Sequence, residues 1–388
     1  MLFGSVLKCF DKSVIRCLYD TTIFFKYVIF CGSVKIIVSI MGNIDQIKTL
    51  RLIRDCFSMK DFDRLSKSIG LVDADYNLDA RISGLDNEDS FAETCRLMGT
   101  ATHIIQLSHN PKFCKEYKVP DFFIRFQPNI SCFDGEQKDI LGKNILVEVK
   151  STNKSKAKVS GEYLRMLRKT SDMMGYPLCI AIRFNTHFTR PFWVIKLDDN
   201  REKNNITFSE DEIDSCMRVI LWDDYNFFIH EDTNISLFYD KSKVTSAYAV
   251  HPEFGSLEKV LIKRGENSVV FAGEDRLVAH LFLESFELKQ IGVQTFGANT
   301  TQYLKPGFYV PSLSDVLFFM NNYIQRFVIE RNERYDRFPF IFDDSIFSRN
   351  SINDMIAPLI DKNLLYKYVP YEPDDQLKIW EKYFGSRV

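Results

Sequence analysis

The chain has 388 residues, of which 45 % are apolar and 26 % are charged, and its formal net charge is −2 at pH 7. This composition is that of a globular, soluble protein, and the length favours two domains. The near-neutral charge excludes a global attraction to nucleic acid, so any such attraction has to come from a local patch. Nine cysteines without CxxC spacing, and no clean secretory signal, predict reduced thiols in a cytoplasmic protein.

Residues 1–40 form a hydrophobic N-terminal extension. The stretch 22–40 is apolar enough to suggest a membrane span, but Lys26 and Lys35 interrupt it. A spanning helix needs about 20 predominantly apolar residues. We therefore expect translation to begin at Met41 and no attachment to a membrane. A membrane anchor and an additional structured helix are the two alternatives.

The next predicted elements are helical. Apolar residues at helical spacing predict one or two helices over 43–70. The stretch 73–89 is rich in Asp, Asn, Gly and Ser and predicts a loop. A helix over 90–107 follows, with Asp89 or Ser90 as its N-cap.

Two short β-rich segments come next, 119–123 with Asp121 and 145–151 with Glu148 and Lys150. Side chains alternate between the two faces of a strand, so Glu148 and Lys150 point to one face. The apolar residues at the odd positions of 145–151 point to the other. Charge on one face of an otherwise apolar strand is costly unless it is paired or bound to a metal.

A basic patch follows these segments. Residues 143–169 contain eight basic and two acidic residues, a local charge of +6. They cover a polar loop over 151–160 and a helix over 161–174. Lysine and arginine contacts to phosphate give sequence-independent affinity for nucleic acids. The candidate backbone contacts are Lys154, Lys156, Lys158, Arg165 and Lys169. A solvated charged loop is the alternative interpretation.

Two apolar strands are predicted over 178–184 and 192–197, followed by a polar linker over 198–209. We place a domain boundary at this linker. The sequence therefore predicts three parts: the N-terminal extension of residues 1–40, a domain of residues 41–200, and a domain of residues 201–388.

The C-terminal part reads as α+β. Short aromatic-rich strands that alternate with turns are predicted over 218–240 and 244–272, and helices over 275–290 and 314–332. The segment 351–361, followed by 364–369, suggests a helix-then-wing element, although the pattern does not identify a winged helix. Neither a P-loop nor a dinucleotide-binding fingerprint is present in the sequence, so no nucleotide cofactor is expected.

The pairing of Pro120-Asp121 with Glu148-Val149-Lys150 resembles the signature of the PD-(D/E)xK nuclease superfamily. The resemblance covers about 88–197. It implies an α/β, restriction-endonuclease-like core, which is a mixed central sheet flanked by helices, joined here to the C-terminal α+β domain. The alternative is a surface Glu–Lys pair and an unrelated turn aspartate.

The resemblance also implies a site. Asp121, Glu148 and the carbonyl of Val149 would bind Mg²⁺, with Mn²⁺ as a substitute, and Lys150 would orient water or neutralise developing charge. A helix before the first catalytic strand often contributes a glutamate in this superfamily, and Glu93 is the candidate for that role. Interaction of this acid with the helix dipole explains Glu93 equally well.

Other residues are weaker candidates for the site. Glu88 is an alternative to Glu93, and Asp134 and Asp139 are alternatives to Asp121, although solvated acids in a loop explain that pair as well. We read His103 and His109 as structural, because no cysteine or acid completes a zinc set with them.

The function expected from this resemblance is that of a magnesium-dependent DNA endonuclease of the restriction, defence or mobile-element type, which hydrolyses phosphodiester bonds. Cleavage of both strands usually needs two active sites, so a homodimer is expected. The alternatives are a structure-selective junction or repair nuclease with the same site, and a non-catalytic nucleic-acid-binding module.

Overall fold

The structure is a computed structural model, and it describes residues 78–107, 116–127, 142–186, 192–215, 217–243, 250–307, 310–332, 347–371 and 373–384. The predictions for 1–40 and for 43–70 lie outside these residues, as do those for His109, Asp134 and Asp139. The chain divides into two compact units, residues 1–89 with 331–337 and residues 90–330 with 338–388. The elements that follow belong to the second unit unless their bounds cross into the first.

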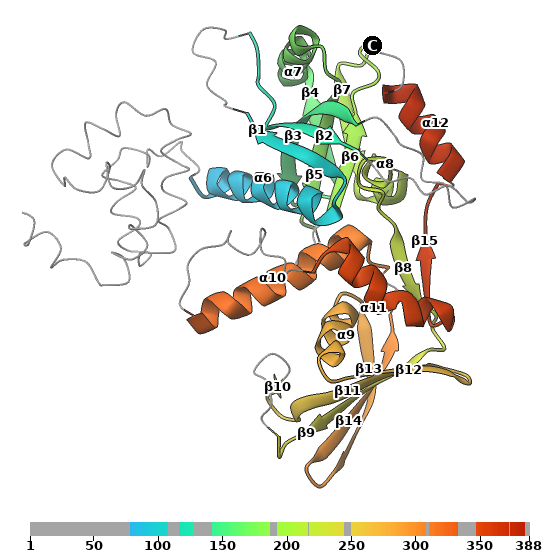
Figure 1. Cartoon of the computed structure of the whole chain (residues 1–388). Helices are drawn as coiled ribbons and strands as arrows, with labels where there is room; N and C mark the ends of the chain where they lie inside the picture. Colours follow the sequence, from blue (N-terminus) through green and yellow to red (C-terminus); the bar gives the residue numbers. More distant parts are fainter. Residues whose placement is uncertain are drawn as a thin grey trace, which may run out of the picture. The chain divides into compact units, whose positions relative to one another are not determined.

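A five-stranded mixed sheet forms the first layer of the second unit (Figure 1). Its strands, in spatial order, are β1 (Ala101–Gln106), β2 (Phe122–Phe126), β3 (Lys143–Thr152), β5 (Leu178–Phe184) and β6 (Phe192–Leu197). Only β3 and β5 are parallel within this sheet, and α7 (Gly161–Met174) lies in the crossover that a parallel pair requires. The mixed α/β sheet predicted from the sequence is thus present.

The alternation along β3 separates two hydrophobic cores. Ile145, Val147 and Val149 belong to the core that also contains Phe91 and Met98 of α6 (Leu78–Met98). Leu146 belongs to the other core, together with Leu164 and Leu167 of α7. The helices α6 and α7 therefore pack against opposite faces of the sheet, and the predicted division of faces along β3 is confirmed.

The helix predicted over 90–107 is wrong at both ends. The observed α6 begins at Leu78, within the predicted loop, so Asp89 and Ser90 lie inside the helix and do not cap it. It ends before Gly99, whose positive φ of 74° suits glycine, and Ala101–Gln106 then forms β1. This segment is a strand despite its helix-like apolar spacing, because it pairs with β2. The composition of 78–89 gives no physical reason for a helix.

The polar loop predicted after Lys150 is partly a strand. β3 continues to Thr152, and Lys156–Ser160 forms β4, which pairs antiparallel with β7 (Asn205–Ser209). The predicted linker over 198–209 is therefore a turn followed by β7. The domain boundary near residue 200 remains a prediction.

The C-terminal part contains a six-stranded antiparallel sheet with α9 (Asp275–Glu284) against one face (Figure 1). Its strands are β9 (Asn234–Asp240), β10 (Val250–His251), β11 (Gly255–Arg264), β12 (Asn267–Ala272), β13 (Leu288–Phe296) and β14 (Asn299–Pro306). The helix predicted over 275–290 ends at Glu284, because Leu288 onwards pairs with β14.

The remaining elements pack around these two sheets. Residues 218–222, in the stretch predicted to alternate short strands with turns, form the short helix α8 (Arg218–Trp222) after a 3-10 turn, η3 (Glu210–Ser215). Within 351–369 the predicted helix is part of α11 (Arg349–Asp361), and β15 (Leu365–Tyr368) follows it and pairs with β8 (Asn226–Ile229). The other two helices are α10 (Leu313–Asn332) and α12 (Pro373–Phe384).

Two further expectations concern cysteines and membranes. The two cysteines in the described ranges, Cys95 and Cys179, are free and buried, and burial raises the pKa of both thiols. None of the described helices is both long and apolar enough to cross a membrane. The apolar stretch 22–40 lies outside the described ranges.

Candidate active site

Asp121 and Glu148 face each other across two neighbouring strands. β2 and β3 pair antiparallel with Phe122 opposite Val147, and this register, continued by one residue, places Asp121 opposite Glu148. Directly opposite residues of an antiparallel pair share one face of the sheet. The two residues are 4 % and 2 % exposed, so both carboxyl groups lie in a poorly solvated environment.

Asp121 is held against the main chain of β3. The amide N–H of Val149 donates to Asp121 Oδ2 at 2.6 Å. A strand residue directs its N–H and its C=O to the same side, so the Val149 carbonyl points toward the strand that carries Asp121. Asp121 and the main chain of Val149 therefore meet where β3 borders the strand that follows Asp121.

Lys150 and Tyr163 both contact Glu148, and with Asp121 these residues form one polar cluster. Lys150 Nζ donates to Glu148 Oε1 and to Tyr163 Oη, both at 2.9 Å, and Tyr163 Oη donates to the same Glu148 oxygen. The ammonium also lies 4.2 Å from the centre of the Tyr163 ring. Lys150 is 37 % exposed, so this end of the cluster opens to solvent.

The second oxygen of Glu148 has a different environment. Glu148 Oε2 is buried and has no hydrogen-bond partner in the described part of the chain. Burial raises the pKa of this carboxyl first, the charge of Asp121 raises it further, and Lys150 and Tyr163 oppose the shift. A buried acceptor without a partner is costly, and a bound cation would supply the missing partner.

The donor set fits a hard cation. Mg²⁺ prefers oxygen ligands, is bound through one or two carboxylates, and keeps several waters. Asp121, Glu148 and the Val149 carbonyl supply oxygen ligands of this kind, with water and substrate phosphate left to complete the coordination. Among the described residues, no group of three or more His, Cys, Asp or Glu side chains is arranged to hold a metal ion.

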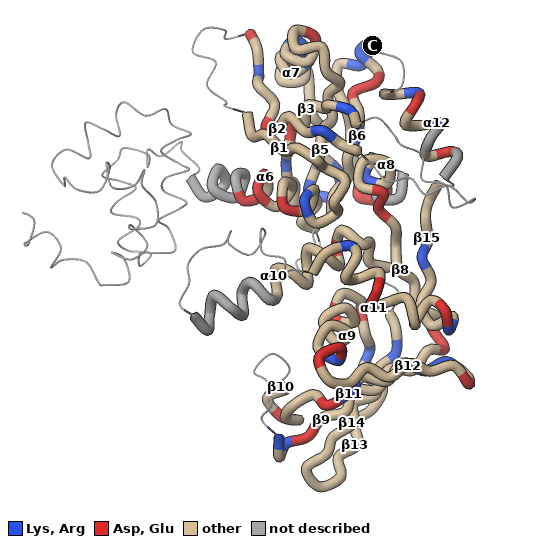
Figure 2. Tube along the Cα trace, in the orientation of Figure 1, with Lys and Arg blue, Asp and Glu red and all other residues tan. Residues whose placement is uncertain are grey.

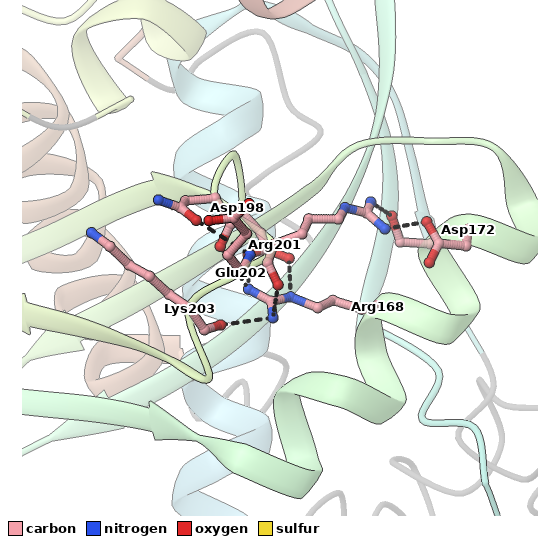
Figure 3. Close-up of polar contacts among 8 residues, drawn as sticks. Arg168, Asp172, Asp198, Arg201, Glu202 and Lys203 are labelled. Atoms are coloured by element: carbon pink, nitrogen blue, oxygen red, sulfur yellow. Dashed lines mark hydrogen bonds and ion pairs between the residues drawn. The ribbon is translucent and has the colours of Figure 1, made fainter.

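Arg168 fixes the helix that carries Tyr163 (Figure 3). Its guanidinium binds both oxygens of Asp198, at 2.7 and 2.6 Å, and donates to the carbonyls of Asn200, Arg201 and Lys203. All five guanidinium N–H groups therefore have acceptors, and the hydrogen bonds to Asp198 raise the pKa of Arg168. This network ties α7 to the turn after β6.

Lys118 is a basic residue near the site that sequence reasoning missed. Its ammonium lies 5.7 Å from the centre of the Tyr163 ring. Its backbone is docked on α7, because Lys118 N–H donates to Met166 O at 3.3 Å and Lys118 O accepts from Thr170 Oγ1 at 2.9 Å. No sequence signal marks this residue, since its position depends on how the segment before β2 packs on α7.

The predicted nucleic-acid contacts differ in their availability. Lys154, Lys156 and Lys158 are exposed, and the last two lie on the same face of β4. Arg165 is exposed beside Glu162, at 4.0 Å. Lys169 forms an ion pair with Glu116 at 2.8 Å, so part of its charge is already neutralised.

The remaining candidates are not brought together with this cluster. Glu93 is half-buried on α6, whose core-facing residues pack on the face opposite to Glu148, so its role stays a prediction. Glu88 lies on the same helix. His103 is exposed on β1, and its ring nitrogen Nδ1 lies 3.2 Å from Thr102 Oγ1.

Comparisons with known proteins add little. No family model matches the sequence, and no curated protein matches it. Among solved structures, the chain is similar to the Holliday junction resolvase Hjc of Archaeoglobus fulgidus, with 14 % sequence identity and a TM-score of 0.23, over 34 % of this chain and 87 % of the resolvase chain. A similarity of this size carries no conclusion about fold or activity.

Proposed function

We propose that this protein is a metal-dependent nuclease that hydrolyses DNA phosphodiester bonds at the Asp121–Glu148–Lys150 cluster. The observation that carries the proposal is Glu148, a carboxyl buried beside a second acid, with one oxygen held by Lys150 and Tyr163 and the other unpartnered. The PD-(D/E)xK-like spacing of these residues supports the same function. Magnesium is the proposed cofactor, and manganese its substitute.

In this proposal Asp121 and Glu148 hold the ion through their carboxylates, and Val149 through its carbonyl. The chemistry that such an ion supplies when bound is activation of water and neutralisation of phosphate charge. Lys150 uses two of its three N–H groups on Glu148 and Tyr163. Its third N–H is left to donate to the attacking water or to a phosphate oxygen.

DNA reaches this cluster along a basic rim in the proposal. Lys154, Lys156 and Lys158 follow β3 directly and are exposed, so their ammonium groups are free to contact the phosphate backbone near the cleavage point. The restriction, defence or mobile-element setting and the homodimer remain part of the same proposal. Linear and branched duplexes, compared as substrates, distinguish a restriction-type enzyme from a junction or repair nuclease.

The test is nicking of a supercoiled plasmid by the full chain, with Mg²⁺ and with EDTA. We expect the wild type to nick the plasmid in Mg²⁺ and not in EDTA. Lys150→Ala should still bind the plasmid but should not nick it. Lys203→Ala is the matched control, because its side chain is exposed and only its backbone carbonyl takes part in the Arg168 network. Equal nicking by wild type and Lys150→Ala, or nicking in EDTA, would contradict the proposal.

One observation favours a second candidate, a non-catalytic nucleic-acid-binding module. Asp121 Oδ2 accepts from the Val149 amide, and Glu148 Oε1 is paired with Lys150, so contacts within the chain stabilise most of the cluster and leave only Glu148 Oε2 without a partner among the described residues. Plasmid binding without any nicking in Mg²⁺ or Mn²⁺ is the result that this second candidate predicts.

A further inference from the structure

The six-stranded sheet has one face that belongs to neither hydrophobic core. Ile235, Leu237 and Tyr239 of β9 point into the larger core, so the even-numbered residues of β9 point to the opposite, outer face. No described helix packs on this outer face in Figure 1, where α9 lies on the other side. The outer-face residues Phe238, Leu261 and Tyr303 are absent from both cores and only half-buried.

A row of lysines crosses one end of the outer face. Lys263 of β11 pairs with Asn234 of β9, and Lys289 of β13 pairs with Lys305 of β14. The β9–β14 register, continued by one residue, places Lys305 next to Asn234. Strands lie about 4.8 Å apart, so the three lysines span about 14 Å in one line.

The rest of the outer face is aromatic and polar. Tyr303 lies on the next row, opposite Ser236 of β9. Lys259 lies over the Phe238 ring, 4.1 Å from its centre, which holds a fourth ammonium group on this face. Phe296, on the same face at the end of β13, is 86 % exposed.

Acidic groups contribute little to this face. Its one outward carboxylate on β9, β11, β12, β13 and β14 is Asp240, which accepts from Ser242 and lies 3.7 Å from Lys243. The nearby bulge residue Glu258 is also paired with Lys243, at 2.8 Å. The tip of the β13–β14 hairpin carries no charge of either sign (Figure 2). On these five strands the outer face therefore carries more lysines than carboxylates. Glu231, Asp232 and Glu266 lie in the turns at its lysine end, and Lys305 Nζ donates to the Glu231 carbonyl at 3.3 Å.

We propose that this outer face binds a single strand of nucleic acid. Ammonium groups in a row suit consecutive phosphates, and exposed aromatic rings suit unpaired bases, which a duplex keeps stacked inside. Lys263, Lys289 and Lys305 contact phosphates, and Tyr303 and Phe296 stack on bases. This binding requires neither hydrolysis nor a metal ion, so it stands or falls separately from the nuclease proposal.

The test is fluorescence anisotropy of labelled 20-nucleotide oligothymidine and oligouridine, and of a 20-base-pair duplex, titrated with the full chain in EDTA. We expect one or both single strands to bind more tightly than the duplex. K263Q/K289Q/K305Q should weaken single-strand binding by about tenfold or more. It should also reduce the slope of log affinity against log salt concentration by about 2, because each phosphate contact contributes about 0.7 to that slope. Y303A/F296A should weaken binding about tenfold without changing that slope.

Two controls keep the result interpretable. K263R/K289R/K305R should retain the affinity, which separates lost charge from lost folding, and the exposed Lys382→Gln on α12 should change nothing. Wild-type affinity in the glutamine variant, tighter binding of the duplex, or loss of single-strand binding in K154Q/K156Q/K158Q alone would overturn the proposal. Self-association of the chain that Phe296→Asp abolishes, without any effect on oligonucleotide binding, would assign the face to a second copy instead.

Discussion

A buried carboxylate beside a second acid is an unfavourable arrangement unless something else stabilises it, and Glu148 is in that position. Lys150 and Tyr163 stabilise only one of its oxygens. Burial and the charge of Asp121 both raise the pKa of the Glu148 carboxyl, because both disfavour its charged form. A cation that contacts both acids would oppose both effects, which is the physical reason for assigning a metal site here.

Tyr163 provides the first test at the residue scale. Tyr163→Phe removes the hydroxyl that accepts from Lys150 and donates to Glu148, while the ring under the ammonium stays in place. We expect nicking activity to fall about tenfold or more, because two hydrogen bonds to charged groups are lost, with little change in the thermal unfolding temperature. Tyr176→Phe is the matched control on the same side of the sheet. Unchanged activity in Tyr163→Phe would show that the hydrogen bonds among Tyr163, Lys150 and Glu148 do not position Lys150.

Asp223 gives a pH-dependent test away from this site. It adopts a left-handed conformation with φ of 49°, which Asp and Asn tolerate, and it pairs with Arg349. Burial raises the pKa of this carboxyl from 3.8 to about 6. Because the folded pKa lies above the unfolded one, the contribution of Asp223 to stability is complete below about pH 4 and is lost as the pH rises through about 6.

Asp223→Asn keeps the backbone conformation and removes the charge. Between pH 4 and pH 7.5 we expect the unfolding free energy of wild type to fall relative to the variant by about 2–3 kcal/mol, measured by urea denaturation at both pH values. The exposed Asp375, replaced by Asn, is the matched control. A constant difference between wild type and Asp223→Asn across this range would contradict the assignment.

At the residue scale, only part of the site follows from sequence. Alternation along one strand is enough to place Glu148 and Lys150 on one face. The contact of Tyr163 with both depends on the rotation of α7 over the sheet, and the docking of Lys118 depends on a loop path. Neither is encoded by local periodicity.

Among the elements, α7 links stability to the site. It presents Tyr163 to β3, and Arg168, one turn and a half further along, fastens it to the turn after β6 (Figure 3). Asp198 is almost fully buried, and its two carboxylate oxygens accept from the Arg168 guanidinium. A shift of α7 would move Tyr163 away from Lys150.

Arg168→Lys keeps the charge but loses the fork and most of the carbonyl contacts. We expect it to lower the unfolding free energy by about 2 kcal/mol, and to lower nicking activity as well, because α7 loses its fixed position. Arg165→Lys on the same helix is the control for stability, since its exposed pair with Glu162 contributes little. Equal stability of the two variants in denaturant titrations would refute the anchoring role of Arg168.

The elements that sequence predicts best are those with one consistent signal. The helix α7 and the strands β5 and β6 have the predicted bounds, because their apolar patterns agree with their length and flanking turns. The sequence predicts a helix at β1, because the apolar spacing there fits the helical period as well as the strand period. Hydrogen bonding to β2 makes this segment a strand. The sequence predicts a loop at β4, because its exposed lysines give no apolar strand pattern. The segment is a strand because it pairs with β7.

For the whole molecule, a net charge of −2 conceals two separate basic surfaces. One is the exposed lysine set of 154–158, which follows β3 along the chain, and the other is the lysine row on the outer face of the six-stranded sheet. The first was visible in the sequence as a run. The second was not, because Lys263, Lys289 and Lys305 are brought together only by strand register.

The central claim is that Asp121 and Glu148 share one divalent ion, and calorimetric titration of Mn²⁺ into the full chain tests it most directly. We predict binding of an ion by wild type that is weakened roughly tenfold or more in both Asp121→Asn and Glu148→Gln. Glu162→Gln, an exposed acid on α7, should bind as wild type does. Equal Mn²⁺ affinity in all four proteins, or no binding by wild type at millimolar concentrations, would contradict the claim.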